Sequence, residues 1–176
     1  KVTANKSLNE AEKAEWERVK NRVQKICQTA YENNQRIFID AEESWIQQAI
    51  DDLANENMAA FNKSKVIVYN TFQLYRSDRL SYLRESIQHG KSHGYHVGAK
   101  LVRGAYMEKE RKRAQEMNYP SPIQPDKETC DKDYNEAIKL CIENIDVMGL
   151  CAGSHNENSS LHLVELMKQK NISPSD

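Results

Sequence analysis

Three short apolar runs, each closed by a polar residue, recur along the chain at intervals of about 30 residues, the length of a strand–helix–strand unit. The polar residues are Asp40, Asn70 and Lys100. Segments with helical periodicity separate the runs, and strands that alternate with helices predict a parallel sheet. Because ligands bind at the carboxyl ends of parallel strands, we expect these three side chains to converge on a functional site.

The predicted helices are marked by apolar residues spaced three and four positions apart, which we expect to face inward. These residues are Trp16, Val19, Val23, Ile26 and Ala30; Ile46, Ala49, Ile50 and Leu53; Leu80, Leu83 and Ile87; Tyr134, Ala137, Ile138, Cys141 and Ile142; and Leu161, Val164 and Met167. A further strand is predicted over residues 149–153, and residues 1–4 are a weak candidate for the first strand of the sheet.

The length of the chain limits the fold that these units can form. A complete (β/α)₈ barrel usually needs about 250 residues, whereas this chain has 176 and begins without a methionine. We therefore predict an α/β fold: residues 1–176 form one incomplete, TIM-like (β/α)₈ barrel domain, from which the later strands and the last helix are missing. The prolines of residues 119–125 indicate an elaborated loop at about 107–133.

Composition argues against several other classes. The net charge of -1 gives no bias toward nucleic acid. The four cysteines form no C-x-x-C pair, and no apolar run approaches the about 18 residues of a membrane span. His89 and His93 have metal-ligand spacing, but no nearby acid completes a zinc site, so we predict no metal.

The segment Lys100–Tyr106 combines two cations, a glycine and a tyrosine at the end of a predicted strand. Lys100 either points into the mouth of the barrel or extends outward past a helix. The fork of Arg103 suits a phosphate or carboxylate, and Gly104 lets the backbone approach a ligand closely. A structural ion pair explains the charges of this segment equally well, so both interpretations stay open.

Two other polar groups sit where a strand meets a helix. Asp40 precedes Glu42 and Glu43, and these acids suit the start of a helix, but the Asp40 carboxylate would also emerge at the rim of the sheet. Ser154, His155 and Asn156 offer a hydroxyl, an imidazole and an amide before a helix, where backbone N–H groups bind anions. Capping of that helix is the alternative.

Taken together, these motifs resemble the proline dehydrogenase family of flavoproteins. The resemblance spans nearly the whole chain, in order, through residues 39–43 (IDAEE), 69–73 (YNTFQ), Lys100–Tyr106 followed by Glu110 and Arg111, and 154–156 (SHN). It implies a distorted (β/α)₈ barrel, of which this chain resembles roughly the first five βα units, with non-covalent FAD across the carboxyl ends of the strands.

The resemblance also implies roles for individual residues. Lys1 and Asp40 are expected to hold the substrate, and Lys100 is expected to lie beside the flavin, so these three are the predicted catalytic residues. The predicted cofactor contacts are Asn70, Lys100, Arg103, Gly104, Ala105, Tyr106, Ser154, His155 and Asn156. The family's tyrosine and arginine pair that caps proline does not occur here, so we expect the 176-residue segment alone to be inactive.

The implied activity is oxidation of L-proline to 1-pyrroline-5-carboxylate, with hydride transfer to FAD N5 and electron transfer to a quinone. Peripheral contact with a membrane follows, at the bacterial inner membrane facing the cytoplasm or at the matrix side of the mitochondrial inner membrane. Two alternatives stay open. One is a Schiff-base aldolase or lyase that uses Lys100 as its nucleophile. The other is a non-catalytic α/β scaffold whose rim charges form ion pairs.

Overall fold

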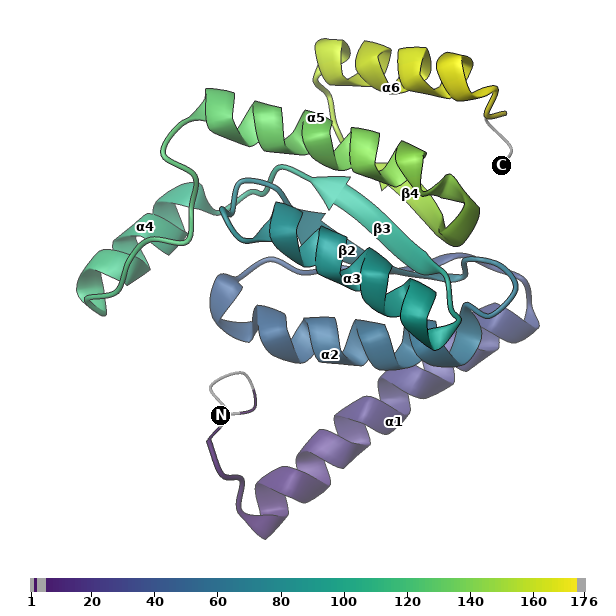
Figure 1. Cartoon of the computed structure of the whole chain (residues 1–176). Coiled ribbons are helices and arrows are strands. Elements are labelled where there is room, and N and C mark those ends of the chain that lie inside the picture. The colour runs from purple at the N-terminus through teal and green to yellow at the C-terminus, as the bar shows by residue number, and fades with distance from the viewer. Residues whose placement is uncertain (1, 3–5, 174–176) are drawn as a thin grey trace.

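Four parallel strands form a single sheet in the order β1-β2-β3-β4 in the computed structural model, which describes residue 2 and residues 6–173 (Figure 1). The strands are β1 (Ile37–Ile39), β2 (Val68–Gln73), β3 (Val97–Val102) and β4 (Met148–Ala152). Spatial order equals chain order. Right-handed crossovers then place every connecting helix on the same side of the sheet, as in a barrel and unlike a doubly wound sheet.

The helices cover one face of this sheet. They are α1 (Glu10–Glu32), α2 (Ser44–Phe61), α3 (Arg79–His93), α4 (Met107–Glu116), α5 (Lys127–Glu143), the 3₁₀ helix η1 (Ile145–Val147) and α6 (Glu157–Lys170). The helices α2, α3 and α5 pack against the strands, while α1 packs on α2 and α6 packs on α5. Figure 1 shows α4 projecting away from this layer. The arrangement is that of a partial TIM-like barrel.

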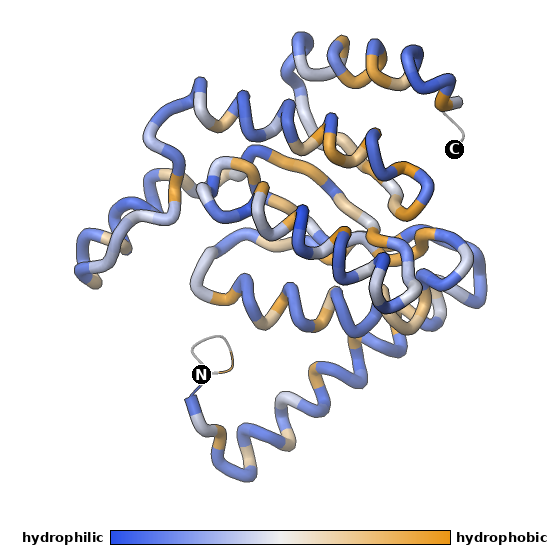
Figure 2. Tube along the Cα trace, viewed as in Figure 1, coloured by the Kyte–Doolittle hydropathy of each residue, from blue (hydrophilic) through white to orange (hydrophobic). Residues whose placement is uncertain are grey.

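The core lies between the sheet and its helices. Its fully buried members come from the strands and from the facing sides of α2, α3 and α5: Val68, Phe72, Ala99, Leu101, Ala54, Met58, Leu83, Tyr134 and Ile138. Figure 2 shows the apolar colour along β3 and hydrophilic colour over most of α1. The sheet is thus held from its helix-covered side, and the face of the sheet away from the helices stays available for a site.

Several predicted core positions are wrong. Ile26, Ile46, Leu161 and Val164 are exposed, whereas Cys27 is the buried residue of α1. On α2 the buried side includes polar residues: Gln47, Asp51 and Asn57. Helical periodicity identifies an apolar stripe, but the neighbouring element determines which side of the helix is covered.

The element boundaries also differ from those predicted. The strand expected to end at Asn70 continues to Gln73, and β3 ends at Val102, so that Lys100 lies within the strand and Arg103–Tyr106 follow it. The segment expected to be a loop at about 107–133 contains α4 and the start of α5, with irregular backbone between them. The predicted first strand, residues 1–4, lies outside the described residues apart from Val2.

Candidate active site

A cleft with a volume of about 220 Å³ lies where β1, β2 and β3 end. Five of the predicted site residues line it, together with residues that the sequence did not single out as site residues. The lining consists of Asp40, Ala41, Glu42, Thr71, Gln73, Lys100, Val102, Gly104, Ala105 and Tyr106. The structure therefore brings Asp40 and Lys100 to one rim, although 60 residues separate them in the chain.

Asp40 and Lys100 form an ion pair at the mouth of this cleft. The Lys100 Nζ atom donates to Asp40 Oδ1 over 2.5 Å and lies 5.5 Å from the centre of the Phe38 ring. The Lys100 side chain is 24% exposed and that of Asp40 is 66% exposed. A pair with one mostly exposed partner gains little from its charges in water, so either partner can exchange the other for a charged group of a ligand.

Thr71 fixes the position of Asp40. Its hydroxyl contacts the Ile39 carbonyl oxygen at 2.9 Å and Asp40 Oδ1 at 3.2 Å. The register of β2 and β3 sets Thr71 directly beside Lys100. The acid, the hydroxyl and the cation thus come from three neighbouring strands, which is the placement that a parallel sheet gives to residues at the same level.

A second cavity of about 370 Å³ adjoins the cleft and shares Val102 and Gly104 with it. It is lined by the remaining predicted cofactor contacts other than Asn70, together with Lys127 and Gly153. The residues are Val102, Arg103, Gly104, Lys127, Gly153, Ser154, His155 and Asn156. The two cavities together follow the ends of β1 to β4 and reach the start of α6.

Arg103 is held by several partners at once. Its Nε donates to Asp131 at 2.6 Å, Nη1 donates to Ser154 at 2.7 Å and Nη2 donates to Ser159 at 2.9 Å. The guanidinium carbon lies 4.2 Å from the centre of the Tyr134 ring. Arg103 therefore connects the end of β3 to α5 and α6, and it orients Ser154 in the second cavity.

Arg103, Lys127, Asp131, Ser154 and Ser159 form one hydrogen-bonded group, which we call the Arg103 cluster, and its cations also fix the charge of Asp131. Burial acts to raise its pKa, but hydrogen bonds from Lys127 and Arg103 outweigh burial, so that the pKa of Asp131 lies below its ordinary value. The Lys127 Nζ atom is 2.5 Å from Asp131 Oδ2. The two cations hold Asp131 in its ionised form.

The start of α6 forms one end of the second cavity. The Asn156 side chain accepts a hydrogen bond from the Ser159 N–H over 3.1 Å, which confirms that it caps the helix. Ser154 Oγ accepts from the Asn156 N–H over 3.0 Å. His155, between them, is exposed and lines the cavity. A capped helix start with an adjacent imidazole suits an anionic group.

Gly104 is required at its position for a local reason. Its φ angle is 116°, which side chains rarely tolerate, and a Cβ atom there would lie 2.4 Å from the Tyr75 ring. Burial raises the pKa of Tyr75 to about 12, so this phenol stays neutral beside the cleft. The close neighbour that demands a glycine is thus Tyr75 of the protein itself.

Asn70 is the predicted site residue that the structure places elsewhere. Its side chain is fully buried, donates to Asp51 of α2 over 2.8 Å and does not line either cavity. Thr71 and Gln73, which follow it on β2, line the cleft instead. Alternation along a strand is the signal that would have found them, because a strand that continues to Gln73 sends Thr71 and Gln73 to the same side. Lys1 lies outside the described residues, and its role stays a prediction.

Neither a metal centre nor a membrane segment is found in the part of the chain that the structure describes. Residue 2 and residues 6–173 contain no group of three or more His, Cys, Asp or Glu side chains arranged to hold a metal ion. Within the same residues, no helix has the length and apolar character needed to cross a bilayer.

A parallel sheet wound in chain order places the protein in the class of TIM-like barrels. Ligand sites in this class lie at the carboxyl ends of the strands, which is where this chain has its charged cleft. Comparison with known proteins narrows this class. The whole chain, residues 1–176, matches the family described as Proline dehydrogenase. The chain belongs to the proline dehydrogenase family.

Individual relatives agree with this assignment. The chain is 34% identical over 165 residues to "Proline dehydrogenase 1, mitochondrial" of Drosophila melanogaster, covering 88% of this chain and 24% of the relative. It is 34% identical over 176 residues to the "Hydroxyproline dehydrogenase" of Xenopus laevis, covering 98% of this chain and 38% of the relative. It therefore spans well under half the length of these curated proteins.

Solved structures show the same fold. The crystal structure of proline utilization A from Bdellovibrio bacteriovorus, inactivated by N-propargylglycine, superposes with a TM-score of 0.83 at 21% sequence identity. The match covers 90% of this chain and 17% of that protein. At this identity the superposition establishes the fold alone.

Proposed function

We propose that the protein containing this chain oxidises L-proline to 1-pyrroline-5-carboxylate with FAD as its redox cofactor. The observation that carries the proposal is the Asp40–Lys100 pair at the mouth of the cleft, in a chain that belongs to the proline dehydrogenase family. The names of the Drosophila and Xenopus relatives support the substrate class. No observation favours the Schiff-base lyase or the non-catalytic scaffold over this proposed oxidation of proline.

The two adjoining cavities fit the cofactor. One is lined by Lys100 and by the exposed backbone around Gly104, and the other is lined by His155 and the start of α6. A flat, electron-accepting ring suits the first, and phosphate groups suit the helix start in the second. Arg103, Ala105, Tyr106, Ser154 and Asn156 complete the proposed contacts, and Asn70 acts through Thr71.

The residues of the cleft have separate tasks in this reaction. When bound, FAD would supply the redox chemistry by taking up the hydride that leaves the carbon beside the proline nitrogen. Lys100 places a positive charge beside the ring and thereby favours its electron-rich, reduced form. Asp40, which is mostly exposed, attracts the positively charged nitrogen of the incoming substrate. This nitrogen must release a proton to the surrounding water before hydride leaves the adjacent carbon. Lys1 is proposed to hold the substrate carboxylate.

The later fate of the electrons and the compartment are part of the same proposal. We propose that electrons pass to a quinone at a membrane that the protein contacts peripherally. Several curated relatives are named as mitochondrial, which favours the matrix side of the mitochondrial inner membrane over a bacterial inner membrane.

The test uses the whole natural protein, purified without added flavin. We expect an absorption band near about 450 nm from bound flavin, which anaerobic L-proline bleaches. Parallel titration with 4-hydroxyproline shows which of the two is the better substrate. A colourless protein that takes up no FAD, or a band that neither amino acid bleaches, would contradict the proposal. Borohydride trapping of Lys100 with a carbonyl substrate would support the lyase instead.

A further inference from the structure

A buried chain of hydrogen bonds leads from the cleft into the layer between β2 and α2. The Gln73 Nε2 atom donates to Gln47 Oε1 over 3.1 Å, and the Gln47 Nε2 atom donates to Asp51 Oδ1 over 2.9 Å. Gln73 lines the cleft, and all three residues are 1% exposed. Polar groups this deeply buried are costly unless they are paired, so their pairing fixes how each one is oriented.

Asp51 is the last residue in this series of hydrogen bonds and the one with the most hydrogen-bond partners. Its carboxylate accepts three hydrogen bonds: from Gln47, from Asn70 at 2.8 Å, and from Arg79 Nη1 at 2.8 Å. Arg79 also donates to Asp78 and lies over the Tyr82 ring. An arginine stays charged in proteins, and the carboxylate with which it pairs can only accept hydrogen bonds.

The donor and acceptor direction of both hydrogen bonds, from Gln73 to Gln47 and from Gln47 to Asp51, follows from this single acceptor. Because Asp51 can only accept, Gln47 must direct its NH₂ group toward Asp51 and its carbonyl oxygen toward Gln73. Gln73 must then use one N–H toward Gln47. Its carbonyl oxygen and its second N–H are left for the cleft. The orientation of the Gln73 amide at the cleft is therefore set by a carboxylate two side chains away.

A second branch leads from Asp51 to the ion pair. Asn70 uses its NH₂ group on Asp51, so its Oδ1 accepts from the Thr71 N–H over 2.9 Å. The Thr71 hydroxyl in turn contacts Asp40. Both branches begin at Asp51 and end at residues that line the cleft, which explains why Asn70 is buried although Thr71 and Gln73 of the same strand line the cleft.

We propose that Asp51 is a positioning residue for the ligand site of this cleft. Its carboxylate fixes the Gln73 amide so that the carbonyl oxygen of Gln73 accepts a hydrogen bond from an N–H group of the bound ligand, and it steadies Thr71 beneath Asp40. The identity of that ligand as the flavin ring rests on the proposed function. The orientation of Gln73 does not, because it follows from the hydrogen bonds of the protein alone.

The same helix carries a matched control. Gln48 and Asp52 repeat the pair one residue further on, with the same four-residue spacing and the same 2.9 Å distance between Nε2 and Oδ1. This second pair is exposed and lies outside both cavities. Asp51→Asn and Asp52→Asn therefore make the same chemical change in α2, one inside and one outside the proposed chain.

The first measurement needs no cofactor. In the ligand-free whole protein, we expect Asp51→Asn to shift the side-chain amide NMR signals of Gln73 and Asn70, because the amide that replaces the carboxylate can no longer accept from every donor. Asp52→Asn should leave both signals in place. Gln47→Met, which removes the middle of the chain but keeps the Asp51–Arg79 pair, should shift Gln73 and spare Asn70. Unshifted Gln73 signals in Asp51→Asn and Gln47→Met would overturn the proposal.

The second measurement uses the FAD-bound protein. Asp51→Asn and Gln47→Met should each weaken FAD binding by about three- to tenfold and move the reduction potential of the bound flavin, because one hydrogen bond to the ligand is lost or reversed. Asp52→Asn should change neither quantity. FAD affinity and potential equal to those of Asp52→Asn would refute the positioning role. A native protein that binds no FAD would refute the proposed function, and the NMR measurement would still decide the orientation of Gln73.

Discussion

Two cations, three residues apart, behave differently at the end of β3. Lys100 has one ionic partner, Asp40, and that partner is mostly exposed. Arg103 donates to three side chains and packs over an aromatic ring. A cation with one exposed partner can take up a ligand, whereas a cation engaged by three partners holds the scaffold.

The difference follows from the position of each residue in the fold. Lys100 lies within β3 on the cleft side, so its surroundings are the rim and solvent. Arg103 lies beyond the strand, where α5 and α6 approach from the outer layer and supply Asp131 and Ser159. Both cations belong to the same sequence motif, but in the structure Lys100 lines the cleft, where we propose that it meets the ligand, and Arg103 mainly holds the scaffold.

The sharpest test of this division is Arg103→Met. The change removes three hydrogen bonds and leaves Asp131 with Lys127 alone. Because Arg103 and Asp131 are partly exposed, we expect a loss of about 2–3 kcal/mol in the free energy of unfolding. Arg103→Lys keeps the charge but loses the fork, so it should lose less. Chemical denaturation measures the free energy of unfolding of both variants. A loss below about 0.5 kcal/mol in Arg103→Met would show that Arg103 does not hold the scaffold.

Acid should weaken the Arg103 cluster in a defined range of pH. The pKa of Asp131 lies below its ordinary value of 3.8 in the folded protein. The folded state therefore favours the ionised form. The stabilisation is fully present above pH 3.8 and is lost as the pH falls through the lower pKa of the folded state.

The variant Asp131→Asn isolates this contribution. The difference in unfolding free energy between the native protein and Asp131→Asn should be constant near neutral pH and should shrink as the pH falls below 3.8. Denaturation curves of both proteins at a series of pH values measure this difference. A difference that stays the same down to the lowest pH would show that Asp131 is not held by its cations.

The smallest effect on stability is expected for Lys100→Met. The variant roughly keeps the side-chain volume and breaks an ion pair whose Asp40 partner is mostly exposed. Such pairs contribute about 0–1 kcal/mol. Thermal unfolding of the ligand-free protein should thus hardly change. A loss as large as that of Arg103→Met would make Lys100 a structural residue and remove the distinction between the two cations.

Much of this arrangement could be predicted from the sequence. The spacing of apolar runs indicates the parallel sheet, and the polar residues that follow or close these runs indicate Asp40 and Lys100 at one rim. The prediction for Asn70 takes the first polar residue as the end of the strand, whereas β2 continues to Gln73. A buried Asn whose partner lies on the preceding helix α2, 19 residues away, leaves no signal in a local pattern.

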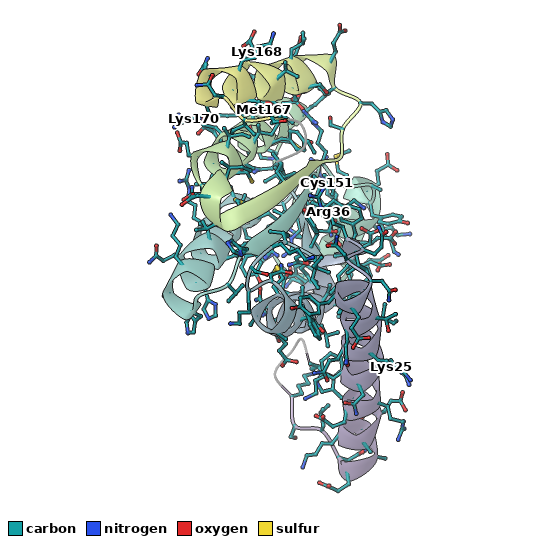
Figure 3. All side chains as sticks on the ribbon, turned by 90° about the vertical axis from the view of Figure 1, so that its right-hand side faces the viewer. Lys25, Arg36, Cys151, Met167, Lys168 and Lys170 are labelled. Atoms are coloured by element: carbon teal, nitrogen blue, oxygen red, sulfur yellow. The ribbon has the colours of Figure 1, made fainter. Side chains whose placement is uncertain are left out.

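The buried polar residues of α2 were not predictable for a related reason. Gln47–Asp51 and Gln48–Asp52 look the same in sequence, yet the first pair is buried and the second is exposed. Hydrophobic periodicity treats all four residues as surface. Their difference depends on Arg79 and Asn70, which α3 and β2 bring to Asp51 from elsewhere in the chain. Figure 3 shows exposed polar side chains of this kind on two other helices, with Lys25 on α1 and Lys168 and Lys170 on α6.

The reduction potential of the flavin in Lys100→Met tests most directly whether Lys100 acts on the bound cofactor. Hydride arrival builds negative charge beside this cation, so the variant should have a lower potential and about ten- to hundredfold slower reduction by proline, with little change in thermal stability. Spectroelectrochemical titration of the native protein and the variant gives the potential. An unchanged potential and an unchanged reduction rate would contradict the account and leave Lys100 as a partner of Asp40 alone.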